Sequence, residues 1–412
     1  MTLSTVCGVG RPSEQHFDHG TVKITKEVTM KITKVLPIYC DGGWRALTFI
    51  KVETDEGIVG YGECTDNRSS FGIGGCVRDL EAILIGKDPT EVGKLYYDML
   101  IHFQQSPGGI AQKTIAGIEI ALWDIKAKAL NLPLYKLWGG PLRDRIRIYW
   151  SHCGTYRARQ HEYFPENLKI KTLDDIHKLG EEVVSRGYTA FKTNIVIPGE
   201  RPRAIRSYDQ NIDHSTLKAI DKLLSTFRKA VGDEVDILLD LNFHFKTEGF
   251  IQIARVVEPY NLMWLEMDIY DPDALLQVKE STKVPICSAE CLYTMKGYRP
   301  YLEKHAMDIC MIDLRWNGFI ESRRVAALAD MYETMIAPHN YVSHLSTFAC
   351  AHLCASVPNV KIMETDVDSV PWRDDLTTDI PEVKDGYLLL PKKPGIGTEL
   401  NEKEIAKHPW PK

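Results

Sequence analysis

Residues 236–290 contain three short apolar runs, DILLDLN at 236–242, NLMWLEM at 261–267 and VPICSAE at 284–290, each with a carboxylate at or near its end. Between them lie amphipathic segments such as TEGFIQIARVVE at 247–258, in which apolar residues recur with helical spacing. Short buried strands alternating with helices of this length are typical of β/α units that share a parallel sheet. This stretch therefore predicts an α/β fold.

The same alternation of strand-like and helix-like segments continues on both sides of this stretch. Five further runs complete the set: RIRIYWS at 145–151, YTAFKTN at 188–194, MDICMID at 307–313, TMIAPHN at 334–340 and VKIMETD at 360–366. Eight consecutive units favour a closed (β/α)8 barrel over an open doubly wound sheet, because no GxGxxG motif opens the first unit.

The N-terminal part has a different pattern. The runs MKITKVLPIY at 30–39 and RALTFIKVETDEGIVGYGEC at 45–64 alternate apolar and polar residues, and 55–57 supplies a hairpin turn, so an antiparallel sheet is expected there. Residues 78–140 show helical periodicity that stops at the Gly-Gly-Pro of 139–141. We expect residues 1–22 to form a tail.

Composition limits the classes of function. The chain has 412 residues with 50 Lys and Arg against 56 Asp and Glu, a net charge of -6, which argues against a nucleic-acid-binding surface or a basic membrane anchor. No apolar run reaches the roughly 18 residues of a membrane helix, and the 10 cysteines form no CxxC pair. We therefore expect a soluble, cytoplasmic protein that acts on small molecules, without nucleic-acid or membrane partners.

Six of the eight runs end in an ionisable residue, at intervals of 26, 24, 23, 26 and 25 residues, or about one β/α unit each. In a barrel this spacing places all six at the carboxyl ends of consecutive strands, which is the face where active sites lie. The six residues are Asp240, Glu266, Glu290, Asp313, His339 and Glu364.

Asp240, Glu266 and Glu290 follow three neighbouring strands, about 4.8 Å apart, so their side chains can converge. Three carboxylates that share a site raise one another's pKa unless a cation neutralises them. Oxygen ligands select a hard divalent ion such as Mg²⁺, and no Cys or His stands at these three strand ends to favour zinc. The sequence therefore predicts one magnesium site.

The next strand ends predict acid–base chemistry. Asp313 beside His339 would set the histidine tautomer and raise its basicity, as expected of a general base. Glu364 is a candidate protonated hydrogen-bond donor to developing negative charge. Lys192 offers a positive partner for a substrate carboxylate, and His244 is a candidate acid for a leaving group. Substrate contacts are predicted for Asn194, Asn242, Arg315, Trp44 and Arg45.

Several strings occur in the order typical of one family: TDEGIVGYGE at 54–63, ALWDIKAKALNLPLYKLWGG at 121–140, then LDLN, WLE, SAE, DLRWNG and APHN. The chain thereby resembles the enolase superfamily and, within it, the mandelate racemase-like branch. The resemblance implies a modified TIM barrel, (β/α)7β, over 141–370, and an α+β capping domain over 23–140. A C-terminal segment, 371–412, is expected to return to the cap.

The ending, PWRDDL at 371–376 and DGYLLLPKKPGIGTELNE at 385–402, is similar to acid-sugar dehydratases of this branch. The resemblance implies one Mg²⁺ held by Asp240, Glu266 and Glu290, and a base, His339 with Asp313, that removes the proton α to a carboxylate. Glu364 takes the position of the hydrogen-bonding acid. Loss of the C3 hydroxyl from the Mg²⁺-stabilised enediolate then gives a 2-keto-3-deoxy sugar acid. A homo-oligomer acting on an aldonate or aldarate is expected.

One departure bears on the reaction. Racemases of this branch carry KxK after the second barrel strand, and this chain has Lys192-Thr193-Asn194, so the second base is replaced by an amide. Three alternatives stay open. The same scaffold could racemise, epimerise or cycloisomerise a carboxylic acid; a barrel glycoside hydrolase could use two of Glu266, Glu290 and Glu364; and a binding protein would have no turnover at all.

Overall fold

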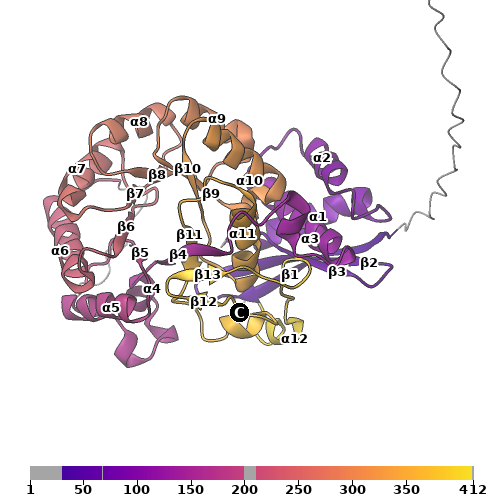
Figure 1. Cartoon of the computed structure of the whole chain (residues 1–412), viewed down its shortest axis with the longest axis horizontal. Coiled ribbons are helices and arrows are strands. Elements are labelled where there is room, and N and C mark those ends of the chain that lie inside the picture. Colours follow the sequence, from indigo (N-terminus) through magenta and orange to yellow (C-terminus); the bar gives the residue numbers. More distant parts are fainter. Residues whose placement is uncertain (1–29, 67, 199–209, 411–412) are drawn as a thin grey trace, which may run out of the picture.

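Eight parallel strands form the centre of the structure (Figure 1). The computed structural model describes residues 30–66, 68–198 and 210–410. Strands pair in chain order from β4 to β10, and β11 pairs in parallel with β4. Ile336 of β10 exchanges backbone hydrogen bonds of 2.7 and 2.9 Å with Asn359 and Lys361, just before β11, which links the last strands back to the first as in a barrel. The strands are β4 Arg145–Ser151, β5 Ala190–Thr193, β6 Asp236–Asp240, β7 Trp264–Glu266, β8 Ile286–Ser288, β9 Ile309–Ile312, β10 Met335–Pro338 and β11 Met363–Asp366.

All eight predicted runs are strands, and helices follow the first seven of them on the outside of the sheet (Figure 1). After β11 the chain forms a short 3-10 turn, η5 Arg373–Leu376, where an eighth unit would place a helix. The architecture is therefore the (β/α)7β form, and the closed (β/α)8 form expected from rhythm alone is wrong. The helices are α5 Leu173–Ser185, α6 His214–Val231, α7 Thr247–Val257, α8 Pro272–Glu280, α9 Thr294–Glu303, α10 Leu314–Met331 and α11 His344–Ser356.

The interior of the barrel explains where the polar strand ends point. Leu238, Trp264, Met311, Ala337 and Ile362 pack together inside the ring as part of one buried cluster. Each stands two positions before an ionisable residue at a strand end, and side chains two apart on a strand face the same side. The buried apolar cluster and the ionisable residues at the strand ends are thus two successive layers of inward-facing side chains.

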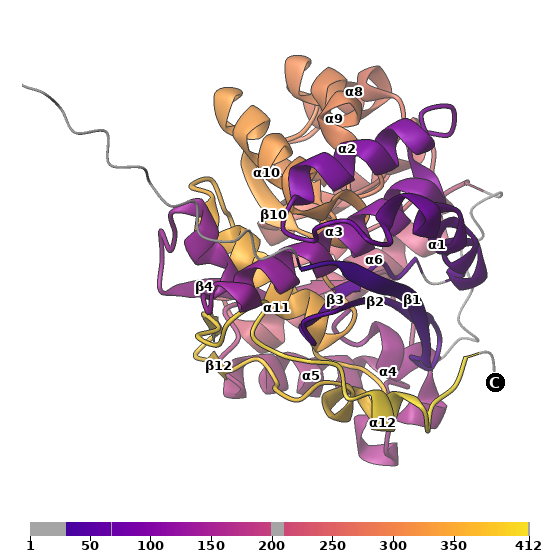
Figure 2. The same ribbon diagram turned by 90° about the vertical axis from the view of Figure 1, so that its right-hand side faces the viewer.

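The N-terminal part forms the predicted antiparallel sheet, with β1 Ile32–Asp41 paired to β2 Ala46–Thr54 and β2 paired to β3 Val59–Glu63. The turn at 55–57 joins β2 to β3, as expected. Three helices pack on this sheet around a separate apolar core and form the capping layer seen in Figure 2: α1 Ser70–Leu84, α2 Val92–His102 and α3 Gly109–Ala129.

Buried carboxylates join this cap to the barrel and to the C-terminal segment. Glu119 of α3 accepts hydrogen bonds from the backbone N–H groups of Phe319 and Ile320 in α10, at 2.7 and 3.0 Å. Asp124 accepts one from the N–H of Ile396 at 2.8 Å. The segment after η5 contributes β12 Val383–Lys384, β13 Tyr387–Leu389 and α12 Glu402–Ile405, with β13 pairing antiparallel to β4. Near its end, the His408 carbonyl accepts a hydrogen bond from the N–H of Asp41 in β1.

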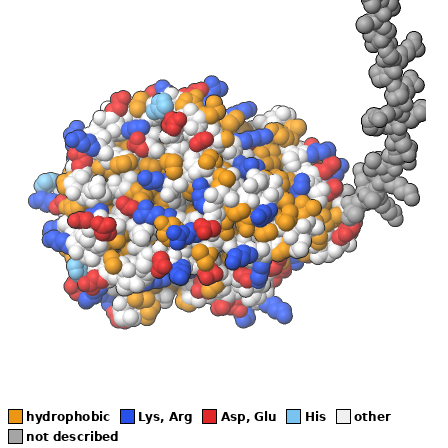
Figure 3. Space-filling view, in the orientation of Figure 1, with side chains coloured by type: hydrophobic (Ala, Val, Ile, Leu, Met, Phe, Trp, Pro, Cys, Tyr) orange, Lys and Arg blue, Asp and Glu red, His pale blue; other side chains and the backbone are white. Residues whose placement is uncertain are grey.

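Acidic and basic side chains are interspersed over the face shown in Figure 3, in keeping with the small net charge. Within the described ranges, no helix is both long enough and apolar enough to cross a membrane. The predicted tail at 1–22, and residues 23–29 of the predicted cap, lie outside the described residues.

Candidate active site

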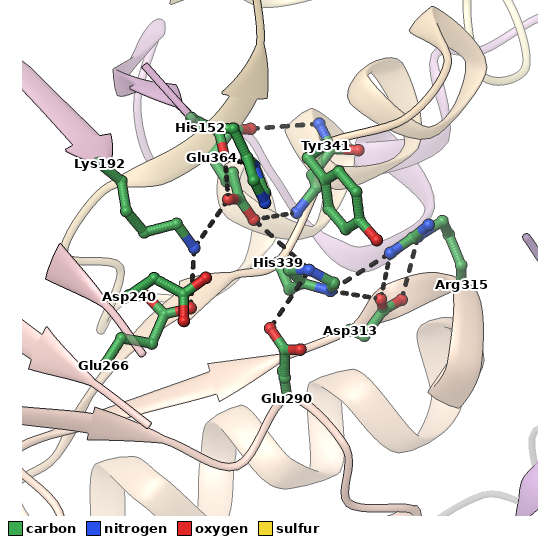
Figure 4. A network of polar contacts seen from close by, with 12 residues as sticks. His152, Lys192, Asp240, Glu266, Glu290, Asp313, Arg315, His339, Tyr341 and Glu364 are labelled. Carbon is green, nitrogen blue, oxygen red and sulfur yellow. Dashed lines mark hydrogen bonds and ion pairs between the residues drawn. The ribbon is translucent and has the colours of Figure 1, made fainter. Parts of the chain in front are cut away.

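Side chains from the carboxyl ends of the barrel strands meet in one polar network (Figure 4). Parallel strands all end at the same edge of the sheet, so residues that are far apart in sequence face one another there. The network brings together eight of the residues predicted from sequence: Lys192, Asp240, Glu266, Glu290, Asp313, Arg315, His339 and Glu364.

Glu290 reaches the network through an irregularity in the backbone. Strand β8 ends at Ser288, and Cys287 is its inward-facing apolar residue, so simple alternation would turn Ala289 inward and Glu290 away. Ala289 instead adopts a left-handed conformation, with φ at +92°. This turn brings the Glu290 carboxylate within 3.2 Å of His339 Nε2.

His339 and Asp313 form the predicted pair. Their Nδ1 and Oδ2 atoms are 2.7 Å apart, and both residues are buried. Arg315 lies behind Asp313 and donates hydrogen bonds to both of its carboxylate oxygens. Burial alone would raise the pKa of Asp313, but the Arg315 guanidinium and the bond from His339 lower it. An ionised Asp313 can only accept a hydrogen bond, so Nδ1 of His339 carries a proton and Nε2 is the ring nitrogen left to exchange one.

Lys192 lies between two carboxylates, with its Nζ 2.8 Å from Glu266 Oε1 and 2.9 Å from Glu364 Oε1. Burial would lower the pKa of Lys192, but the charges of Glu266 and Glu364 outweigh it and raise that pKa well above its usual value. The lysine is therefore a fixed cation and has no lone pair with which to act as a base.

Glu364 differs from the protonated donor expected from the sequence. Its carboxylate accepts hydrogen bonds from Ser151 Oγ at 2.5 Å and from the backbone N–H of Asn340 at 2.7 Å, in addition to the Lys192 contact. Burial opposes ionisation, but the Lys192 charge and these donors hold the pKa of Glu364 well below its usual range. An ionised carboxylate accepts hydrogen bonds only, so Glu364 is an acceptor that keeps Lys192 in place.

Of the three predicted metal ligands, Asp240 and Glu266 are buried and Glu290 is partly buried; a fourth carboxylate, Asp268, is buried near them. Burial, together with neighbouring carboxylates, raises the pKa of Glu266 to about 8 and of Asp268 to about 7, and raises that of Glu290 well above its usual value. Ligand atoms of Asp268, Glu290 and Cys291 lie within 4.8 Å of one another. Within the described residues, the ligand atoms of Asp240, Glu266 and Glu290 do not all lie within this distance of one another. Each carboxylate contacts a different partner: Asn194, Lys192 and His339, respectively.

This electrostatic arrangement fits a divalent cation. Carboxylates that raise one another's pKa lack a neutralising charge, and a cation bound among them would let all of them ionise. The donors are oxygens, which is the ligand type that Mg²⁺ prefers. The side-chain amides of Asn194 and Asn242 hydrogen-bond Asp240 at 2.9–3.0 Å, and they orient its oxygens.

A cavity of about 200 Å³ opens beside this network. Its wall includes His339, the carboxylates Asp240 and Glu290, and both predicted amides, so Asn194 and Asn242 are placed where they can touch a substrate. The rest of the wall is formed by His152, Thr155, Tyr156, Arg159 and Tyr341.

Three of the predicted substrate contacts, Arg315, Trp44 and Arg45, and the predicted acid His244 are not among the described residues that line this cavity. Arg315 is behind Asp313, and Nδ1 of His244 is buried with no hydrogen-bond partner among the described residues. Trp44 stacks on Tyr156, with ring centres 4.1 Å apart. Arg45 is 2% exposed and pairs with Asp366 at 2.5 Å, a contact between cap and barrel. The sequence pattern does not reveal which side chains line the cavity, so it could not exclude these four residues.

Three residues near the reacting groups were not predicted from the sequence: His152, Asp268 and Tyr341. Asp268 and Tyr341 each stand two positions after a predicted site residue, so the same alternation that aligned the strand ends could have found them. His152 follows the first run, RIRIYWS, and its left-handed backbone, with φ at +50°, gives no simple alternation signal.

Comparisons with known proteins place the chain in a family. Residues 24–139 match the family model for the N-terminal domain of mandelate racemase and muconate lactonizing enzyme, and residues 175–404 match the enolase C-terminal domain-like model. A D-xylonate dehydratase of Haloferax volcanii is 30% identical, covering 92% of this chain and 89% of its own. A D-gluconate dehydratase of Thermoproteus tenax is 29% identical, covering 89% of this chain and 71% of its own.

Among solved structures, a Burkholderia xenovorans protein provisionally named L-alanine-DL-glutamate epimerase, bound to magnesium and fumarate, is 37% identical. It superposes with a TM-score of 0.88 over 92% of this chain and 96% of its own. The two family models together span most of the described chain, one over the cap and the other over most of the barrel and the C-terminal segment. The chain therefore belongs to the enolase superfamily, in the mandelate racemase and muconate lactonizing enzyme branch.

Proposed function

We propose that the protein is a Mg²⁺-dependent dehydratase of sugar acids, a hydro-lyase. One observation carries the choice of reaction: the amide of Asn194 stands where racemases of this branch carry a second basic lysine, and Lys192 is a fixed cation. Elimination of water needs a base on one face of the substrate only. The names of the curated relatives, xylonate and gluconate dehydratases, support the substrate class.

Asp240, Glu266 and Glu290 would hold the metal, and a bound Mg²⁺ would supply Lewis-acid stabilisation of the negative charge that develops on the substrate carboxylate. Lys192 lies beside Glu266 and the side-chain amide of Asn194 lies beside Asp240. Near the metal ligands, they would add a positive charge and a hydrogen-bond donor. These groups are buried and already oriented, so little reorganisation is needed when the charge forms.

His339 starts the reaction by taking the C2 proton on Nε2. The imidazolium that results is stabilised by Asp313, which Arg315 keeps ionised. The electron pair left at C2 then forms a double bond to C3, the bond from C3 to its hydroxyl breaks, and the imidazolium returns the proton so that water leaves. The enol product tautomerises to a 2-keto-3-deoxy sugar acid.

An epimerase on the same scaffold is the second candidate, because the solved structure with 37% identity bears that name. Epimerisation needs a proton acceptor on one face of the carbanion and a donor on the other. The amide at Asn194 and the ion-paired Lys192 argue against a second base on the far face. In D₂O an epimerase returns both C2 epimers carrying deuterium, without keto acid, and that result would exclude a dehydratase.

The direct experiment is a screen of aldonates and aldarates, including D-xylonate, D-gluconate and D-galactonate, for release of a 2-keto acid with Mg²⁺ present. Treatment with EDTA should abolish the release, and Mg²⁺ should restore it. Cleavage of a glycoside that survives chelation, without keto-acid release, would favour a glycoside hydrolase built on the glutamates instead. Release of keto acid from none of the sugar acids would refute the proposal.

We further propose that the protein works in the cytoplasm as a homo-oligomer. All cysteines of the described residues are free thiols, as expected in a reducing compartment. Size-exclusion chromatography with light scattering would test the oligomeric state.

A further inference from the structure

His152 is a partly buried imidazole that the proposed mechanism does not use. It directly follows strand β4 and lines the same cavity as His339. Its ring stacks on Tyr156, with centres 5.0 Å apart and planes at 18°, and contacts Tyr341 at 4.7 Å. The Tyr341 ring also contacts His339 at 5.0 Å, so one tyrosine touches both imidazoles (Figure 4).

Hydrogen bonding fixes the tautomer of His152. Ser151 Oγ lies 2.5 Å from Glu364, and an ionised Glu364 can only accept, so the single hydroxyl proton of Ser151 points to that carboxylate. Nδ1 of His152 is 2.6 Å from the same Oγ and must therefore be the donor in that contact. The neutral ring consequently carries its lone pair on Nε2.

The surroundings keep this ring neutral. Burial lowers the pKa of His152 well below its usual value, and the positive charges of Lys192 and Arg45 act in the same direction, while the charge of Glu364 opposes them. A neutral imidazole with a lone pair on Nε2 is a proton acceptor, so it is poorly suited to protonating a leaving hydroxyl group. It is suited to taking a proton from a hydroxyl group in the cavity.

We propose that His152 is a second acid–base residue of this site, whose Nε2 takes the C2 hydroxyl proton when the enol left by elimination becomes the keto acid. The proposal rests on the proposed dehydratase function. The O–H bond breaks and its proton moves to Nε2; the oxygen electrons form the C2 carbonyl; and the double-bond pair takes a proton from solvent at C3. His152 then returns its proton to solvent, which balances the step.

This role has a stereochemical consequence. If the enol becomes the ketone inside the cavity, the walls expose one face of C3, and in D₂O one deuterated diastereomer should form. If the enol escapes, it becomes the ketone in solution, where both faces are open. The fate of the enol can therefore be read from the product.

The test uses the full-length protein with Mg²⁺ in D₂O and the sugar acid found active in the screen, and proton NMR of C3 in the product. Wild type should give one diastereomer. His152→Gln, which keeps a hydrogen-bonding side chain but cannot take a proton at this pH, should still consume substrate and give both diastereomers in equal amounts. His177→Gln, at a partly exposed histidine on α5 paired with Glu181, is the matched control and should behave as wild type.

A single diastereomer from His152→Gln would overturn the proposal, and so would complete loss of substrate consumption in a folded variant, because His152 would then act at or before elimination. If His152→Gln unfolds, Ser151→Ala decides: it keeps the imidazole and removes its tautomer lock, so mixed labelling supports the role and a single label refutes it. Absence of keto acid from wild type refutes the dehydratase function itself, which is a different outcome.

Discussion

Replacing Asp313 by Asn should separate the two tasks that this carboxylate performs. Asp313 holds the Nδ1 proton of His339 at 2.7 Å, and it also neutralises Arg315, which is 2% exposed. In addition its side chain caps the N-terminus of α10 by accepting a hydrogen bond from the N–H of Trp316 at 3.2 Å. The substitution keeps the size of the side chain and removes its charge.

The effect on rate follows from the tautomer. An amide can present its NH₂ group to Nδ1, which moves the ring proton to Nε2 and removes the lone pair that accepts the substrate proton. The same exchange of Asp for Asn in a serine-protease triad lowers kcat by about 10⁴-fold, and general base catalysis contributes about 10²- to 10⁴-fold. We expect kcat to fall by about 10²- to 10⁴-fold.

The effect on stability follows from the buried guanidinium. Removing one partner of a buried ion pair costs about 3–5 kcal/mol. Glu63 is the next carboxylate acting on Arg315, and it stays in place, so a loss near the lower limit, about 3 kcal/mol, is expected.

The assay is keto-acid release under saturating substrate, with urea unfolding measured in parallel. A matched control is available in Asp374→Asn, which alters a similar His–Asp contact, His344 Nε2 to Asp374 at 2.8 Å, at a carboxylate that is 61% exposed. That control should keep its activity. An Asp313→Asn enzyme with kcat within a few-fold of wild type would refute the assignment of His339 as the base.

Three further outcomes are expected. Affinity for Mg²⁺ should rise as the pH rises to about 8, because Mg²⁺ binding requires Glu266 and Asp268, with pKa values of about 8 and about 7, to be deprotonated. A pH-independent affinity, measured by calorimetry, would contradict this. His339→Asn should abolish exchange of the C2 proton with D₂O while Mg²⁺ still binds, and exchange that persists would point to another base. Arg45→Met should cost about 3–5 kcal/mol in urea unfolding by breaking the buried pair with Asp366, whereas Arg299→Met, at an exposed pair, should cost at most about 1 kcal/mol.

The sequence by itself determined the architecture and the main chemical groups. Strand and helix periods are local properties, so eight runs were found from spacing alone. Alternation along a strand and the common edge of a parallel sheet then align residues such as Asp240 and Glu266 without any knowledge of packing. Whether a helix follows the last strand does not depend on local periodicity in this way. The alternation of strand and helix patterns predicted a helix after β11, and the structure has a short 3-10 turn there.

Only the tertiary structure decided protonation, and which residues the cavity exposes. The residues next to Glu364 in the sequence do not show whether its carboxyl group is ionised. Its ionisation depends on Lys192 and Ser151, which come from two other strands. Arg45 and Trp44 have side chains suited to binding a sugar acid, yet Tyr156, on which Trp44 stacks, lines the cavity in their place. His152 has no distinguishing motif, and its basic nitrogen is defined by hydrogen bonds that reach across 213 residues, from Ser151 to Glu364. Charge and accessibility depend on neighbours in space, which residue spacing along the chain does not encode.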